Sequence, residues 1–104
     1  MLTQKQKDVY SKDGYVILPN VISNNNLQAM IKDLNKWIEE SKSQKNNYGK
    51  TKNGKARFDL EEGHSKENPK LRRVANPTDI SEAYRNVLFE GPAISAIIDL
   101  IGPD

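Results

Sequence analysis

The one histidine and the carboxylates near it limit the metal and acid–base chemistry that this chain can carry. The sequence has a single histidine, His64, and no cysteine. An iron site of two histidines and a carboxylate, or a zinc site of several imidazoles or thiolates, therefore cannot be built from one copy of the chain. His64 with Glu61 and Glu62 could hold a stray divalent cation, but a lone histidine in a Gly-His-Ser loop is more often solvated. Adjacent carboxylates on a strand point to opposite faces, so Glu61 and Glu62 are not a facing acid–base pair.

Two consecutive arginines, Arg72 and Arg73, are the next candidates for binding chemistry. In an extended segment, neighbouring side chains face opposite ways, so one arginine can point inward while the other stays in water. An inward guanidinium can bind a carboxylate through two parallel hydrogen bonds. The alternative is an arginine that pairs with an aspartate or glutamate at the rim of the core.

A basic stretch follows residue 41 and has no acidic residue before Asp59. Its cations are Lys42, Lys45, Lys50, Lys52, Lys55 and Arg57. One hypothesis is a small, non-enzymatic binding module that uses residues 42–57 for nucleic acid or another anionic partner, with Tyr48 as a stacking ring. The other is a solvated, mobile basic loop over residues 42–55, which is typical of charge runs with one aromatic residue. We expect the mobile loop, and nucleic acid is the minority hypothesis.

The sequence before the basic stretch contains signals for two helices. Thr3 and Gln6 form a capping box that predicts a short helix running towards Gly14. Ser23 is a good N-cap for a long amphipathic helix, in which Trp37 is expected to be buried. The apolar stripe of that helix consists of Leu27, Met30, Ile31, Leu34, Trp37 and Ile38. Such a stripe predicts a packing face.

Short strands and two further helices complete the predicted α+β fold. The run 15–18 predicts a buried strand that Pro19 ends, and 56–61 and 70–74 are further extended pieces that pair with each other or with 15–18. A capping box at Asp79 predicts the third helix, and Pro92 the first turn of the last one. Trp37 is expected to pack on the 15–18 strand and on this last helix. A strand of four residues needs a larger sheet.

Length and composition indicate one small domain. The chain has 104 residues, 29% charged and 36% apolar, so its core must be small or shared. A net charge of +2 gives no whole-protein argument for nucleic acid or an anionic membrane. The polar amino terminus carries no signal peptide pattern, and no apolar run reaches membrane-spanning length, so we expect a cytoplasmic protein without a membrane partner.

Taken in order, these segments resemble the amino-terminal part of the phytanoyl-CoA dioxygenase family. A leading Leu-Thr-x-x-Gln helix comes first, and five other stretches follow. A long amphipathic helix lies between the stretch that ends at Ser23 and the one that begins at Phe58. Those stretches are Asp13 to Pro19, Val21 to Ser23, Phe58 to Glu61, Arg72 to Pro77 and Ile98 to Pro103. The match spans essentially the whole chain.

The resemblance implies a fold, an activity and two cofactors. Family members fold as a double-stranded β-helix, a jelly-roll, preceded by helices and outer strands, and are non-haem iron(II) and 2-oxoglutarate dependent oxygenases that hydroxylate small organic substrates. A His-x-Asp pair and a distant histidine hold the iron, and a distal arginine holds 2-oxoglutarate; all lie downstream of the matched region. Arg73 lies near where members often carry a basic residue that reaches the 2-oxoglutarate site.

The resemblance therefore predicts that residues 1–104 are a single incomplete domain, an amino-terminal fragment that is inactive by itself and binds neither iron nor 2-oxoglutarate. Its short strands would belong to a jelly-roll that lies outside this sequence. Apolar surface left exposed would favour self-association. The coding sequence past Asp104 would distinguish an oxygenase fragment from a small binding module.

Overall fold

The structure is a computed structural model that describes residues 2–102. In this range the chain is α+β, with a two-stranded antiparallel sheet. Its elements in chain order are α1 (Gln4–Asp13), α2 (Asn24–Ser41), β1 (Phe58–Leu60), β2 (Leu71–Val74), the 3-10 turn η1 (Pro77–Asp79), α3 (Glu82–Phe89) and α4 (Pro92–Ile101).

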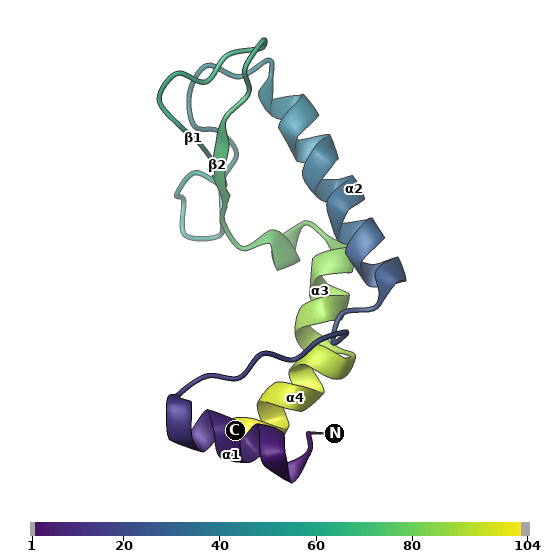
Figure 1. Cartoon of the computed structure of the whole chain (residues 1–104). Coiled ribbons are helices and arrows are strands. Elements are labelled where there is room, and N and C mark those ends of the chain that lie inside the picture. The colour runs from purple at the N-terminus through teal and green to yellow at the C-terminus, as the bar shows by residue number, and fades with distance from the viewer. Residues whose placement is uncertain (1, 103–104) are drawn as a thin grey trace.

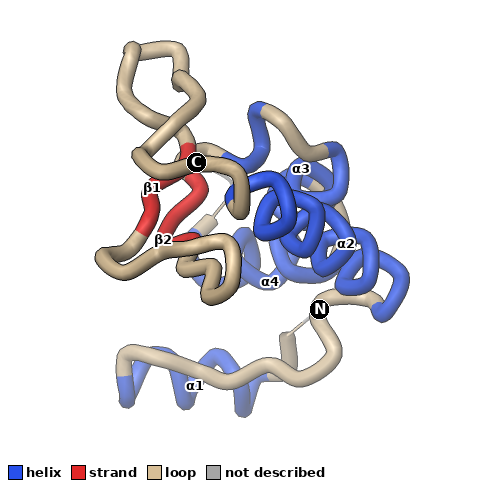
Figure 2. Tube along the Cα trace, turned by 90° about the horizontal axis from the view of Figure 1, so that it is seen from above, coloured by secondary structure: helices blue, strands red, loops and turns tan. Residues whose placement is uncertain are grey.

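The elements form an elongated arrangement of 50 × 29 × 25 Å. The sheet lies beside the carboxyl-terminal half of α2, and α3 and α4 continue from it towards the opposite end, where α1 lies (Figure 1). Seen from above, α2, α3 and α4 cluster together while α1 stands apart from them (Figure 2). The backbone N–H of Leu2 donates to the Asp99 carboxylate at 3.1 Å, which ties the start of the chain to α4.

The helix boundaries follow the predicted caps at three of four starts. The capping box of Thr3 and Gln6 begins α1, and Gly14 ends it in the left-handed conformation, with φ of 79°. The Ser23 hydroxyl accepts the N–H of Asn26 and begins α2, and Pro92 lies in the first turn of α4. These local signals therefore acted as predicted.

The third helix begins later than predicted. Asp79 was expected as its N-cap, but Asp79 lies in η1, and the N-cap is Ser81. Asn76 adopts a left-handed conformation with φ of 49° directly before Pro77, which turns the chain into a 3-10 turn first. The buried Ser81 hydroxyl then accepts the N–H of Tyr84 and donates to the Asp33 carboxylate at 2.6 Å, so α3 starts against α2.

The predicted strand at residues 15–18 is not formed. This segment is extended and pairs with no other strand among residues 2–102. Tyr15 and Ile17 are 63% and 81% exposed, whereas Val16 and Leu18 are half-buried. The segment keeps the alternation of a strand, but a strand requires a hydrogen-bonding neighbour, and the described chain provides none.

The buried apolar core is small. Only Trp37, Phe58 and Ala96 are buried among the apolar side chains of residues 2–102. The Trp37 ring packs against Phe58 at 6.3 Å and against Tyr84 at 5.4 Å. Burial of Trp37 is thus confirmed, but its aromatic partners come from β1 and α3, and not from the expected 15–18 segment and last helix.

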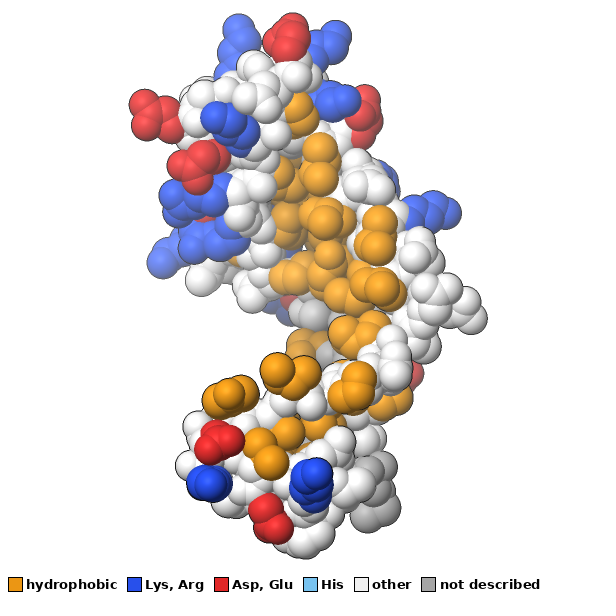
Figure 3. All heavy atoms as spheres, in the orientation of Figure 1, with side chains coloured by type: hydrophobic (Ala, Val, Ile, Leu, Met, Phe, Trp, Pro, Cys, Tyr) orange, Lys and Arg blue, Asp and Glu red, His pale blue; other side chains and the backbone are white. Residues whose placement is uncertain are grey.

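The rest of the apolar stripe on α2 is only partly covered. Leu27, Ile31 and Leu34 remain 38–42% exposed. Figure 3 shows a band of apolar side chains down one face of the molecule, along α2 and towards α3 and α4. The most exposed apolar side chain in α3 is Phe89 (65%), and the most exposed in α4 is Ile101 (67%). The stripe is therefore a largely uncovered face, and not the closed core predicted from its period.

Candidate functional site

The predicted site residue Arg73 lies on β2 directly opposite Asp59 on β1. The Arg73 guanidinium forms an ion pair with the Asp59 carboxylate. The Arg73 side chain is 63% exposed, whereas that of Asp59 is only 11% exposed. The cross-strand carboxylate thus holds one end of an otherwise solvated arginine.

A β-bulge explains why the arginine pair differs from the expected inward-and-outward arrangement. Asp59 pairs with Arg73 and Leu60 pairs with Leu71, so Arg72 is an extra residue on β2. A bulge places two residues opposite one and interrupts the strict alternation of side chains. Both arginines are exposed, while Leu71 and Val74 on either side are half-buried. Neither guanidinium is enclosed in an interior, because the bulge turns both towards water.

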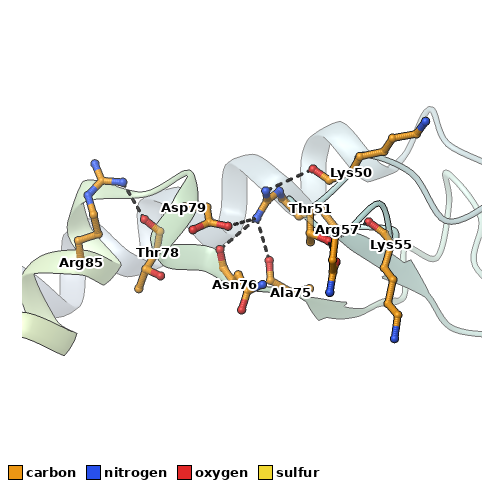
Figure 4. Close-up of polar contacts among 10 residues, drawn as sticks. Lys50, Thr51, Lys55, Arg57, Ala75, Asn76, Thr78, Asp79 and Arg85 are labelled. Atoms are coloured by element: carbon orange, nitrogen blue, oxygen red, sulfur yellow. Dashed lines mark hydrogen bonds and ion pairs between the residues drawn. The ribbon is translucent and has the colours of Figure 1, made fainter.

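Arg57 is the polar residue with the most partners at this end of the molecule, although the sequence pattern indicated it only as one cation of the basic stretch. Its buried guanidinium donates to the carbonyl oxygens of Ala75 at 3.0 Å, Asn76 at 3.1 Å and Lys50 at 3.3 Å. It also lies 3.4 Å from the Asp79 carboxylate (Figure 4). One side chain therefore joins the 42–55 segment, the end of β2 and η1.

The partners of Arg57 indicate a positioning role. Two of its acceptors flank the left-handed Asn76, whose conformation sets the start of η1. A buried guanidinium is stable only when its donors are satisfied, and here backbone carbonyls satisfy them. Arg57 and Asp59 are charged, yet both are only 8% exposed, because hydrogen-bond acceptors surround the Arg57 guanidinium and the Arg73 cation covers the Asp59 carboxylate.

The 42–55 segment packs along β1. Tyr48 exchanges two backbone hydrogen bonds with Phe58, at 3.1 and 2.9 Å, and its ring stacks on the Phe58 ring at 4.6 Å. The Asn47 side chain accepts the N–H of Leu60 at 2.8 Å, and Thr51 is buried. This packing differs from the independent, solvated loop expected from composition, because aromatic stacking and backbone pairing compensate for the missing apolar period.

Tyr48 carries an unusual polar group. Its hydroxyl oxygen is buried and has no hydrogen-bond partner among residues 2–102. Burial raises the pKa of Tyr48 above its ordinary value, and the nearby Glu40 carboxylate adds to the increase. Burial also raises the pKa of Tyr84, with Asp33 as the second cause. Tyr48 is thus a packed aromatic residue, with one face covered by Phe58.

The cations of the basic stretch are divided between paired and exposed groups. Lys42 forms an ion pair with Glu39 at 2.8 Å, and Arg57 is buried. The four remaining cations are exposed: Lys45, Lys50, Lys52 and Lys55.

His64 is held by two backbone groups, and is not the solvated residue expected of its loop. One ring nitrogen, Nε2, lies 2.8 Å from the carbonyl oxygen of Ser41, and the other, Nδ1, accepts the N–H of Lys70 at 2.8 Å. A carbonyl can only accept, so these partners specify the neutral ring with its proton on Nε2. His64 therefore joins the end of α2 to the segment that enters β2.

Iron does not fit the residues described. Within residues 2–102, no group of three or more histidine, cysteine, aspartate or glutamate side chains could hold a metal ion.

An apolar cavity of about 420 Å³ lies between α2, η1, α3 and α4. Its lining includes Met30, Pro77, Tyr84, Leu88 and Ile97. Like the uncovered apolar face, this cavity is lined by apolar side chains that water still reaches, since Leu88 and Ile97 are both about half exposed.

No protein-family model, curated protein or solved structure matches this chain. None of the helices between residues 2 and 102 is both long enough and apolar enough to cross a bilayer.

Proposed function

We propose that this chain is the amino-terminal portion of a phytanoyl-CoA dioxygenase-like oxygenase that uses iron(II) and 2-oxoglutarate to hydroxylate an organic substrate. In this proposal residues 1–104 supply the helices and outer strands that precede a jelly-roll. The iron ligands and the distal arginine lie outside this sequence. The bound iron and 2-oxoglutarate would supply the oxygen chemistry, and the described residues would support the jelly-roll and position its strands.

The observation that carries the proposal is the mismatch between the size of the chain and the size of its core. Three buried apolar side chains among residues 2–102 are too few for a self-contained domain of this length. The radius of gyration is 17.2 Å, whereas a compact domain of this length has about 13 Å. An uncovered apolar face beside an extended, unpaired segment at 15–18 supports a scaffold whose sheet lies elsewhere.

Arg73 is the residue that we propose contacts 2-oxoglutarate in the complete protein. Its exposed guanidinium has donors left over after the ion pair with Asp59. A carboxylate ligand would bind to those donors or replace Asp59. The Asp59 pair is the competing, purely structural role for the same side chain.

The test begins with the coding sequence past Asp104, which should encode a His-x-Asp pair and a later histidine followed by an arginine. The complete protein should then form succinate from 2-oxoglutarate, and Arg73→Ala should raise its 2-oxoglutarate requirement, whereas Arg72→Ala, the matched control, should not. Equal effects of the two variants would leave Arg73 with its structural role alone.

The 104-residue chain by itself should neither show the charge-transfer absorbance of iron(II) with 2-oxoglutarate under anaerobic conditions nor release succinate when oxygen is added. Succinate above a metal-only blank, lost in His64→Ala, would contradict the proposal and would require a site assembled between copies.

The second candidate function is a small module that binds an anionic partner through residues 42–57. Four exposed lysines support it. The burial of Arg57 and the stacking of Tyr48 on Phe58 remove the two residues best suited to contact a base or phosphate. Salt-sensitive binding of an oligothymidylate that is lost when all four lysines become glutamine would favour this function.

A further inference from the structure

The outer edge of β2 is the open side of the sheet. On β1, Phe58 is hydrogen-bonded to Tyr48 on the side away from β2, so β1 has a neighbour on each side. Among residues 2–102, β2 pairs with β1 alone. A two-stranded sheet is marginally stable in water, and an open edge is a template for a further strand.

The register shows which backbone groups face that edge. The N–H and C=O of Phe58 bond to Tyr48, so its partner Val74 turns its own backbone groups away from β1. The N–H of Leu60 donates to the Asn47 side chain, and its partner Leu71 is turned away in the same manner. The backbone groups of Leu71 and Val74 bond to no other element among residues 2–102.

The charges on β2 discriminate between occupants of the edge. A second copy paired antiparallel through β2 would bring arginines opposite arginines, and like charges directly opposite destabilise a sheet. Arg73 is already paired with the carboxylate of Asp59 on β1, whereas Arg72 forms no ion pair with any residue from 2 to 102.

We propose that the edge of β2 docks an extended, acidic segment of another polypeptide. Backbone hydrogen bonds to Leu71 and Val74 provide the pairing. A glutamate or aspartate near Arg72 provides the selectivity. This charge pair would resemble the one that Asp59 on β1 already makes with Arg73 on β2. This inference does not rest on the proposed oxygenase function.

The experiment uses the full chain and a fluorescein-labelled hexapeptide of alternating valine and glutamate, followed by anisotropy at physiological ionic strength. A valine–lysine hexapeptide is the matched probe. We expect the acidic peptide to bind and the basic one not to bind. Arg72→Glu should weaken the acidic peptide about tenfold, since a favourable charge pair becomes a repulsive one, and should create binding of the basic peptide. Lys36→Glu, an exposed change on α2, is the control and should alter neither.

Two further measurements separate strand pairing from simple charge attraction. An acidic peptide N-methylated along one edge should lose its binding, and the unmodified peptide should protect the amides of Leu71 and Val74 from hydrogen exchange. Arg72→Gln, with its neutral side chain, is the second variant in case Arg72→Glu disturbs the strand. The proposal is overturned if the N-methylated peptide binds equally well, if Lys36→Glu weakens binding as much as Arg72→Glu, if neither peptide binds, or if those amides are already protected in the free chain by self-pairing.

Discussion

At the scale of single residues, the polar groups that organise this chain are the ones that bond to backbone. Arg57 and His64 each join two or more segments through carbonyl or N–H groups. Such contacts leave no pattern of types and spacing in the sequence, because any residue supplies a carbonyl. For this reason the sequence pattern indicated only that Arg57 is one cation of a basic stretch and that His64 lies in a loop.

Replacing Arg57 should be more damaging than replacing any exposed cation near it. Arg57→Ala leaves three carbonyls and the Asp79 carboxylate without their donor, and we expect a loss of about 3–5 kcal/mol in the free energy of unfolding. Arg57→Lys keeps the charge but not the fork, and should recover only part of that loss. Urea unfolding followed by circular dichroism measures both. Lys55→Ala is the exposed control, and an Arg57→Ala protein as stable as that control would contradict the positioning role.

Tyr48 should respond in the opposite direction. Its buried hydroxyl has no partner among residues 2–102, so Tyr48→Phe should raise the free energy of unfolding by about 1 kcal/mol. The raised pKa means that the folded chain favours the neutral phenol. The associated stability is present below the ordinary tyrosine pKa of about 10 and is lost as pH rises above it. Tyr48→Phe should therefore also reduce the loss of stability above that pH. A destabilised Tyr48→Phe would mean that the hydroxyl is hydrogen-bonded.

At the scale of elements, caps and turns were predictable and pairings were not. Thr3, Ser23 and Pro92 acted through neighbours within one helical turn, so their signals are contained in the sequence around them. The 56–61 and 70–74 pieces were recognised as extended and do pair with each other. Their bulge, and the failure of 15–18 to pair, depend on partners distant in sequence or outside residues 2–102, which no local pattern specifies.

The 42–55 segment provides the test at this scale. Composition predicts that replacing residues 42–54 with a short Gly-Ser bridge changes the melting temperature no more than a surface substitution would. The bridge from Tyr48 to Phe58, the Asn47 contact with Leu60 and the Lys50 carbonyl on Arg57 predict a loss instead. We expect the latter, a fall of about 10 °C, which corresponds to roughly 2 kcal/mol. A Gly-Ser insertion between Lys45 and Asn46, two exposed residues of the same segment, is the control and should be neutral. An unchanged melting temperature for the deletion would restore the mobile loop.

At the scale of the whole molecule, the dominant feature is apolar surface without a cover. Among residues 2–102, twelve large apolar side chains are exposed, from Tyr15 to Ile101. Sequence periodicity correctly identified the apolar side of α2, α3 and α4. Period alone does not say whether a covering element is present, which is why Trp37 is buried as expected and Leu34 on the same stripe is not.

We therefore expect the isolated chain to self-associate through this face. Ile101→Lys combined with Phe89→Glu should shift sedimentation towards the monomer without lowering the free energy of unfolding of that monomer, since both side chains are mostly in water. Lys36→Glu combined with Glu67→Lys, two exposed positions, is the control, because it also introduces one acidic and one basic side chain and leaves the net charge unchanged. Sedimentation velocity across a concentration series gives the result, and an equal shift in the control would assign self-association to charge.

The bulge on β2 also has a consequence for the gain and loss of codons. Arg72 is one residue more than the ladder needs, because Asp59 with Arg73 and Leu60 with Leu71 would be consecutive pairs without it. Deleting the Arg72 codon would leave Leu71 and Arg73 on opposite faces of a regular strand, each still opposite its present partner. Most single-residue deletions in a strand reverse every side chain beyond them. This position is the place in the sheet where a one-codon difference between related genes would be tolerated.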